Sequence, residues 1–412
     1  MTRILVWVCV LVILLAVAPL SLAAGGSEAE SAPHTSADAT WESYNDTGVK
    51  ACNTGEIGKA VTVFKQAVEL AETFGPGDRR LGRSLNNLAM AYQIAGKYEQ
   101  AEPLHKRALA VREKAFGPDD PDVAQSLKNL ASLYVNLDRD AEAEPLYRRS
   151  LAIREKALGP DDPAVASSLS GLARLYRKRR KFEQARPLLE RALAIDEKAA
   201  GPNHPDTACG LMDLGNCYRQ LDQYTKAEPL LKRAVAIYQE AIGPDCPATA
   251  TALYNLGFLY YVQDRYAEAE PLFKRALAIK QEHFGPEHPD TLDNLSKLGM
   301  IYMYVKKFDQ SETLLQRALA VREKTARPGQ PGVARALHRL GRLYMRGRLH
   351  QAVPILERAV ALAEKTLGPQ HPDTVVFRYN LALAKRKLAA GQTSVHEGDD
   401  RAVTPRRPAP FH

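Results

Sequence analysis

Residues 77–84 have the glycine spacing of a loop that binds phosphate through its backbone amides. Such a loop needs a lysine just before its final hydroxyl residue, and a strand in front of it. Arg83 occupies the lysine position, and no strand pattern precedes the segment. We therefore interpret these residues as a loop that leads into a helix.

Histidine is a common metal ligand, and a His-Pro-Asp sequence occurs three times. It begins at His204, His288 and His371. The three histidines belong to separate loops, and Asp120 or Asp162 fills the same position in other loops. A side chain at this place can accept a backbone N–H at the start of a helix. The pattern predicts caps or turns, and no metal site.

The sequence lacks the common catalytic motifs. Gly-x-Ser-x-Gly, His-Glu-x-x-His and paired Cys-x-x-Cys are all missing. The hydrolase, zinc-protease and zinc-ribbon classes therefore have no supporting residues. We expect no catalytic residue, no cofactor and no small-molecule substrate, and predict that the chain is not an enzyme.

One tyrosine recurs every 42 residues through most of the chain. It is found at Tyr92, Tyr134, Tyr176, Tyr218, Tyr260, Tyr302 and Tyr344. Before the first, Leu85, Leu88 and Ala89 complete an i, i+3, i+4, i+7 pattern, which is one face of an α-helix. A period of this length is typical of a solenoid of small, similar units.

A second helical stripe follows each of these helices after a short turn. In the first full unit it carries Ala101, His105 and Ala108 and ends before Gly117-Pro118. Glycine supplies the left-handed conformation that ends a helix, and the proline of Asp120-Pro121 suits the first turn of the next one. Each unit is thus predicted to hold two helices, which we call helix A and helix B.

The pattern Leu-x-x-Leu-(Ala/Gly)-x-x-Tyr resembles the tetratricopeptide repeat. The 42-residue period and the phrase Ala-Glu-Pro-Leu-x-x-Arg-Ala-Leu-Ala are similar to the longer repeats of kinesin light chain and nephrocystin-type proteins. The resemblance covers residues 40–390. It implies an all-α fold, a right-handed α-solenoid of about eight helix-turn-helix repeats, with a C-terminal capping helix.

The two ends of the chain differ from the repeats. Residues 1–24 are predicted to be a signal peptide, with an uncleaved membrane anchor as the competing interpretation. Residues 25–39 are expected to form a flexible linker, and residues 391–412 a disordered tail. The chain is therefore expected to be exported, and to be periplasmic or secreted. In that setting Cys209 and Cys246 could form a disulfide, or remain thiols.

Residues 373–390 continue the helix A pattern as one last helix. Arg378 and Lys385 stand where the preceding repeat has Leu337 and Tyr344. Charges at these positions are compatible with no further repeat packing there, so we predict a polar cap.

By the same resemblance, helix A residues that face away from helix B line a concave groove and bind peptides. The predicted peptide-binding residues are Asn87, Asn129, Arg174, Arg177, Lys178, Tyr254, Asn255, Phe258, Tyr261, Met300, Met303, Tyr304, Arg339, Arg342 and Arg346. Aromatic and methionine side chains offer adaptable contact area, and arginine pairs with carboxylates. We expect a peptide with a bulky apolar anchor and acidic neighbours. Packing of some aromatics between helices A is the alternative.

In kinesin-light-chain-like repeats, an asparagine before the central leucine contacts the peptide backbone. Asn87, Asn129, Asn255 and Asn380 match it, whereas other repeats carry a different residue there. The exceptions are Gly171, Asp213, Lys297 and Arg339. Binding is therefore expected to concentrate in part of the groove.

Residues 177–181, Arg-Lys-Arg-Arg-Lys, form the densest run of positive charge, and the whole chain carries a formal charge of +8. A solvated turn and a surface for anionic lipid or polysaccharide are the two interpretations of this run. Nucleic acid is not an expected partner. Together these features predict a non-enzymatic protein-interaction scaffold.

Overall fold

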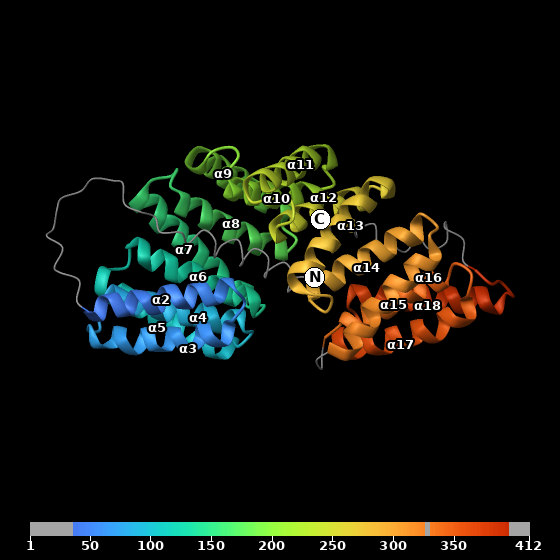
Figure 1. Ribbon diagram of the computed structural model, residues 1–412, viewed down its shortest axis with the longest axis horizontal. Helices are drawn as coiled ribbons and strands as arrows, with labels where there is room; N and C mark the ends of the chain where they lie inside the picture. Colours follow the sequence, from blue (N-terminus) through green and yellow to red (C-terminus); the bar gives the residue numbers. More distant parts are fainter. Residues whose placement is uncertain (1–35, 326–329, 395–412) are drawn as a thin grey trace. The chain divides into compact units, whose positions relative to one another are not determined.

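The computed structural model describes residues 36–325 and 330–394 (Figure 1). Helix A of successive repeats is α2 (Ser36–Asn53), α4 (Arg79–Ile94), α6 (Pro121–Asn136), α8 (Pro163–Lys178), α10 (Pro205–Gln220), α12 (Pro247–Val262), α14 (Pro289–Tyr304) and α16 (Gly332–Tyr344). Helix B is α3 (Ile57–Thr73), α5 (Tyr98–Phe116), α7 (Asp140–Leu158), α9 (Phe182–Ala200), α11 (Tyr224–Ala241), α13 (Tyr266–Phe284), α15 (Phe308–Thr325) and α17 (Leu349–Leu367). A single helix, α18 (Pro372–Ala389), follows.

The predicted all-α repeat fold is confirmed: the described residues hold eight helix pairs and one last helix, and none of them forms a strand. The chain divides after Gly243 into two compact units. Unit 1 contains α2 to α11, and unit 2 contains α12 to α18. Within each unit, consecutive helices pack against one another.

The chain ends depart in part from the expected boundaries. The first helix begins at Ser36, so the last four residues of the predicted linker are helical and that part of the prediction is wrong. The predicted leader, the rest of the linker and most of the tail lie outside the described residues. No helix within the described ranges combines the length and the apolar character needed to cross a membrane.

Helix starts follow the sequence pattern. Asp120 Oδ1 accepts the N–H of Asp122 at 2.7 Å, and Asp162 caps α8 in the same way. His204 Nδ1 accepts the N–H of Asp206 at 3.2 Å. His288 and His371 make the matching bonds at 3.2 and 3.1 Å. The predicted capping role of the histidines is confirmed, and no metal-binding cluster occurs among the described residues.

The turn between helices A and B uses the recurring tyrosine. The N–H of Lys97 returns to the carbonyl of Tyr92 at 2.8 Å, and Arg139 and Lys181 repeat this bond with their own tyrosines at 2.9 and 2.8 Å. This is the six-residue bond of a Schellman motif, which needs a left-handed residue just before the donor. Gly96 supplies it in the first full repeat, with φ 74°.

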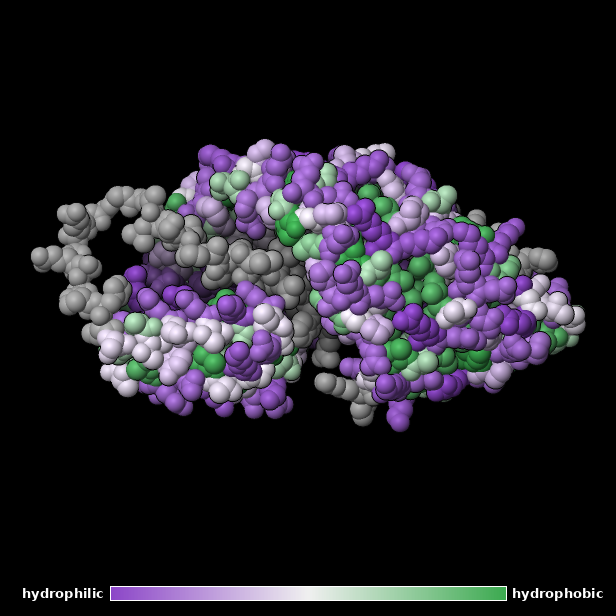
Figure 2. Space-filling model, viewed as in Figure 1, coloured by the Kyte–Doolittle hydropathy of each residue, from purple (hydrophilic) through white to green (hydrophobic). Residues whose placement is uncertain are grey.

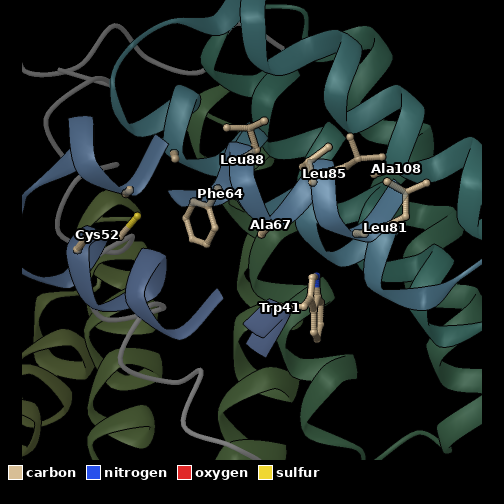
Figure 3. Packing of buried hydrophobic residues seen from close by; sticks show 13 residues of the cluster. Trp41, Cys52, Phe64, Ala67, Leu81, Leu85, Leu88 and Ala108 are labelled. Carbon is tan, nitrogen blue, oxygen red and sulfur yellow. The ribbon is translucent and has the colours of Figure 1, made fainter. Parts of the chain in front are cut away.

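The hairpins pack through small residues at the helix crossings. A Cβ added to Gly215 would lie 2.8 Å from Leu231 Cγ, and one added to Gly341 would lie 2.6 Å from Leu356 Cδ2. The prediction that large side chains would force these helix pairs apart is therefore supported. In unit 1, the core joins Trp41, Phe64 and Leu85 from three successive helices (Figure 3).

The last helix caps unit 2 with paired charges. Arg378 contacts Glu364 at 2.6 Å and Lys385 contacts Glu357 at 2.7 Å, so both point back to α17. Val375 and Tyr379 remain 50% and 45% exposed. The cap is therefore polar only in part.

Candidate functional site

The predicted site lies on the helix A surfaces. In unit 2, α12 carries three aromatic side chains in a row. The rings of Tyr254 and Phe258 stack with centroids 6.3 Å apart, and those of Phe258 and Tyr261 stack at 5.9 Å. All three side chains are half-buried. The structure thus brings together the aromatic residues that the sequence predicted, and we call them the aromatic row.

Tyr304 of α14 extends the aromatic row toward the next repeat. Its ring lies 6.1 Å from that of Tyr261 and stacks on Tyr266 at 4.6 Å. The alternative, that aromatics pack between adjacent helices A, therefore holds for the Tyr261–Tyr304 contact. The sequence analysis missed Tyr266, although aromatic residues begin helix B in most other repeats as well.

A pair of opposite charges borders the aromatic row. Lys297 Nζ lies 4.4 Å from the Phe258 ring centroid, a cation–π contact. The Tyr254 hydroxyl donates to Asp293 Oδ2 at 2.5 Å, and Arg339 lies 3.6 Å from that carboxylate. Burial alone would raise the pKa of Asp293, but the cations of Arg339 and Lys297 lower it to about 2. Asp293 is therefore ionised at neutral pH.

Two predicted residues do not reach this surface. Met300 and Met303 are 3% and 2% exposed and belong to a core with Leu315, Leu340 and Leu343. The expectation that methionines line an exposed concavity is wrong for both. Their helix packs against α16, whose leucines cover them.

The remaining predicted residues of unit 2 are mostly buried or half-buried. Asn255 and Arg342 are each 8% exposed. Arg342 Nη2 donates to the Tyr304 hydroxyl at 2.9 Å, which links α16 to the aromatic row. Arg346 follows α16 and is half-buried. Arg342 thus brings positive charge close to the aromatic side chains.

In unit 1 the predicted residues form polar links between neighbouring repeats. Asn87 Nδ2 donates to Asn45 Oδ1 at 2.9 Å, whereas Asn129 accepts from Gln125 of its own helix. Arg174 Nη2 donates to Ser132 Oγ at 2.6 Å and to the Tyr147 hydroxyl at 3.1 Å. The polar side chains thus lie along the helix A surface, but the asparagines do not form one continuous ladder.

The basic run at residues 177–181 is largely paired with acids. Arg177 contacts Asp213 at 2.5 Å, and Lys178 contacts Asp140 at 2.8 Å. Arg179 contacts Glu144 at 2.7 Å. Three of the five cations therefore have a carboxylate partner, which favours a structural turn over a surface for anionic lipid.

A depression of about 410 Å³ opens between α7, α8 and α9. Its lining includes Glu144, Tyr176 and Leu188, with Lys181 from the basic run. Tyr176 donates its hydroxyl to Glu144 at 2.9 Å. No residue of the predicted peptide site lines this depression.

None of the four cysteines that the structure describes forms a disulfide, so Cys209 and Cys246 are not joined. Sequence analysis also missed Lys128, which lies on the helix A surface of unit 1. Its amine donates to Ser167 Oγ at 2.7 Å. The sequence does contain a signal for this residue, because the equivalent positions in other repeats are Asn86, Ser170 and Met212 and carry no charge.

Stacked helical hairpins with a polar and aromatic helix A surface define an α-solenoid repeat protein. The tetratricopeptide repeat profile matches seven overlapping segments, 48–114, 80–156, 129–198, 165–240, 206–282, 248–324 and 290–361. The chain therefore belongs to the tetratricopeptide repeat family. Among curated proteins, none matches the chain.

Several solved structures are similar. Kinesin light chain-like repeats from Podosopora anserina are 27% identical over 50% of this chain and 97% of theirs, with a TM-score of 0.44. BtubC (BKLC) from P. vanneervenii is 25% identical over 58% of this chain and 94% of its own, with a TM-score of 0.47. The chain is thus similar in sequence to kinesin light chain-like repeats.

A Rap protein solved in complex with Competence and Sporulation Factor is 16% identical, covers 85% of this chain and 99% of its own, and has a TM-score of 0.52. This likeness shows a shared fold. Scaffolds of this repeat class typically mediate protein–protein interaction through the surface that the stacked repeats present.

Proposed function

We propose that the chain is a non-enzymatic scaffold that binds a protein segment along its helix A surface. The segment carries a bulky apolar anchor with acidic neighbours. The observation that supports this proposal best is the aromatic row of α12. Its three rings run along one helix and stay half-buried in the isolated chain, so a partner can cover them further.

The anchor follows from the chemistry of the aromatic row. Aromatic rings supply a large contact area at low conformational cost, and such residues dominate the binding energy of many interfaces. A bulky apolar side chain against Phe258 and Tyr261 would remove much of their remaining exposed surface from water. The surface of unit 2 is mostly hydrophilic in this view, with apolar patches over the region of α14 and α16 (Figure 2).

The acidic neighbours follow from the charges around the aromatic row. Arg339 and Arg342 approach it from α16, and Lys297 from α14. Guanidinium groups form directional bonds with carboxylates. An anionic lipid or polysaccharide surface is not supported in the same way, because the densest basic run is paired with acids of the chain itself.

The test is capture of partners from an extract of the source cells on the immobilised full chain. The double variant Phe258→Ala with Tyr261→Ala is compared with Phe308→Ala, which removes a 39% exposed aromatic ring from helix B of the same unit. We expect the double variant to recover about tenfold less partner, and Phe308→Ala to recover as much as the wild type. Circular dichroism checks that each variant is folded. If the folded double variant retains every partner, the proposal is wrong.

A further inference from the structure

The last helix, α18, leaves open a face that the preceding helix A keeps buried. In α16 this face packs on α17, and Gly341 lies at the crossing. Its other members there, which are 0%, 2% and 7% exposed, are Ala334, Leu337 and Tyr344. The equivalent residues of α18 are all exposed: Val375, Arg378, Ala382 and Lys385. No described helix follows α18, so in the described ranges it lacks a helix B of its own.

This open face of α18 combines apolar and basic side chains. Six large apolar side chains are exposed in the described residues, and half of them lie on α18: Val375, Tyr379 and Leu388. Val375 and Tyr379 are one turn apart, and Ala382 and Arg386 continue the same exposed face. The helix carries one acid and four bases, a net charge of +3. Exposed apolar side chains gathered among charges are typical of an interaction surface.

The described residues after α18 do not cross this face. The carbonyl of Thr393 accepts the N–H of Leu349 at 3.2 Å. Leu349 begins α17, so residues 390–394 lead toward α17 and away from Val375 and Tyr379. The face is therefore open to another molecule.

The first described helix, α2, also has an open face. Trp41 donates its ring N–H to Ser84 of α4 at 2.8 Å, and Gly48 lies against Phe64 of α3. A preceding helix B covers the remaining side of α4 and α6, but no described helix precedes α2. The exposed residues on its open side include Ala39, Glu42, Ser43, Asp46, Thr47 and Lys50. The helix carries three acids and one lysine, a net charge of −2.

We propose that the protein associates head to tail, with the open face of α18 in one copy docked on the open face of α2 in a second copy. The charges favour this pairing, because a helix of net charge +3 meets one of net charge −2. A symmetric contact between two α18 helices would instead place +3 against +3. The proposal concerns surfaces outside the aromatic row and does not rest on the proposed function.

The two faces also match in side-chain size. Tyr379 projects from α18, whereas α2 offers the small residues Ala39 and Ser43. Within a repeat, the same pairing of large and small residues lets Leu356 pack on Gly341. Docking would remove the exposed part of Tyr379 from water. A contact between two single helices is small, so we expect weak, salt-sensitive association.

A contact between two different surfaces can repeat from copy to copy. A copy whose α2 face is occupied still offers its α18 face, so such an interface builds open chains or closed rings. Head-to-tail association therefore predicts assemblies larger than a dimer at high concentration.

Analytical ultracentrifugation of the full chain, at concentrations from about 5 to about 200 µM, tests the proposal. The α18 variant is Val375→Ser with Tyr379→Ser, which removes the exposed apolar side chains. The α2 variant is Glu42→Lys with Asp46→Lys, which reverses the acidic charge. All four positions are exposed, and circular dichroism checks that each variant is folded.

Glu99→Lys and Lys114→Glu are the matched controls, because each reverses an exposed charge on α5. We expect the mean mass of the wild type and of both controls to rise with concentration beyond that of a dimer. In about 0.5 M salt this rise should diminish. Each end variant alone should associate about tenfold more weakly and stay largely monomeric.

An equimolar mixture of the two end variants gives the sharpest result. The α2 variant keeps its α18 face, and the α18 variant keeps its α2 face. One intact pair of faces therefore remains between them, and the mixture should form a dimer that grows no further. The two altered faces do not attract each other, because both are basic.

A wild type that stays monomeric at every concentration would overturn the proposal, as would association that both end variants retain. Self-association that depends on only one of the two ends would do so as well, since a symmetric α18 contact gives that pattern. Neither end variant changes the aromatic row. Partner capture and head-to-tail association can therefore fail independently of each other.

Discussion

In several repeats, a glutamate of helix B accepts a hydrogen bond from the recurring tyrosine of the next helix A. Glu144 accepts the Tyr176 hydroxyl at 2.9 Å and pairs with Arg179 at 2.7 Å. Glu312 likewise accepts the Tyr344 hydroxyl at 2.7 Å and pairs with Arg348 at 2.6 Å. Each glutamate thus fastens helix B of one repeat to helix A of the next. We call this arrangement the glutamate clamp.

Replacing one clamp residue should destabilise unit 2. Hydrogen bonds from Arg348 and Tyr344 lower the pKa of Glu312 below its usual value, although burial alone would raise it. Glu312→Gln should therefore reduce the free energy of unfolding by about 1–2 kcal/mol at pH 7. Because a lowered pKa stabilises the fold only while the carboxylate is ionised, the gap between variant and wild type should shrink below about pH 4.

Urea unfolding at pH 7 and at pH 3, followed by circular dichroism, measures this gap. Glu99→Gln is the control, because Glu99 is exposed in the first turn of α5. A gap that stays the same at both pH values would show that the Glu312 charge contributes nothing.

At the scale of the helices, the turn between helices A and B is set by backbone geometry. The left-handed residue of the Schellman motif is glycine in the first full repeat. In the next five repeats it is Asp138, Arg180, Asp222, Asp264 and Lys306, with φ between 58° and 62°. A left-handed residue with a Cβ costs roughly 1 kcal/mol relative to glycine. These turns therefore carry a small strain that the packing of the hairpin overcomes.

Arg180→Gly should remove that strain. The side chain is exposed, so the change should raise the free energy of unfolding by about 0.5–1 kcal/mol. Arg180→Ala keeps the Cβ and should give no such gain. Urea unfolding of the two variants side by side gives the measurement, and equal stability of both would rule out backbone strain as the cause.

The helices also show how far the sequence could predict the site. The tyrosine period, the capping residues and the small residues at crossings each depend on local spacing, and all appear as expected. Met300 and Met303 occupy positions that are half-buried in most other repeats, but α16 brings Leu340 and Leu343 over them. Burial, and then the charge of Arg154 from α7, lowers the pKa of Lys128. The spacing of residues within helix A reveals neither cause.

At the scale of the whole chain, identical architecture carries different surface chemistry in the two units. Unit 1 presents serine, asparagine and cations on helix A, whereas unit 2 presents the aromatic row. The repeat fold fixes where these side chains lie, and the substitutions between repeats decide what they bind. A scaffold of this kind needs no reacting group, because its contribution is a firmly held surface.

Photo-cross-linking from the aromatic row tests the central claim most directly. p-Benzoylphenylalanine is placed at position 258 or, as the control, at position 308 of the full chain, and irradiated with an extract of the source cells. The account predicts that position 258 cross-links to one defined, acidic protein segment and that position 308 does not. Equal or undefined cross-linking from both positions would contradict it.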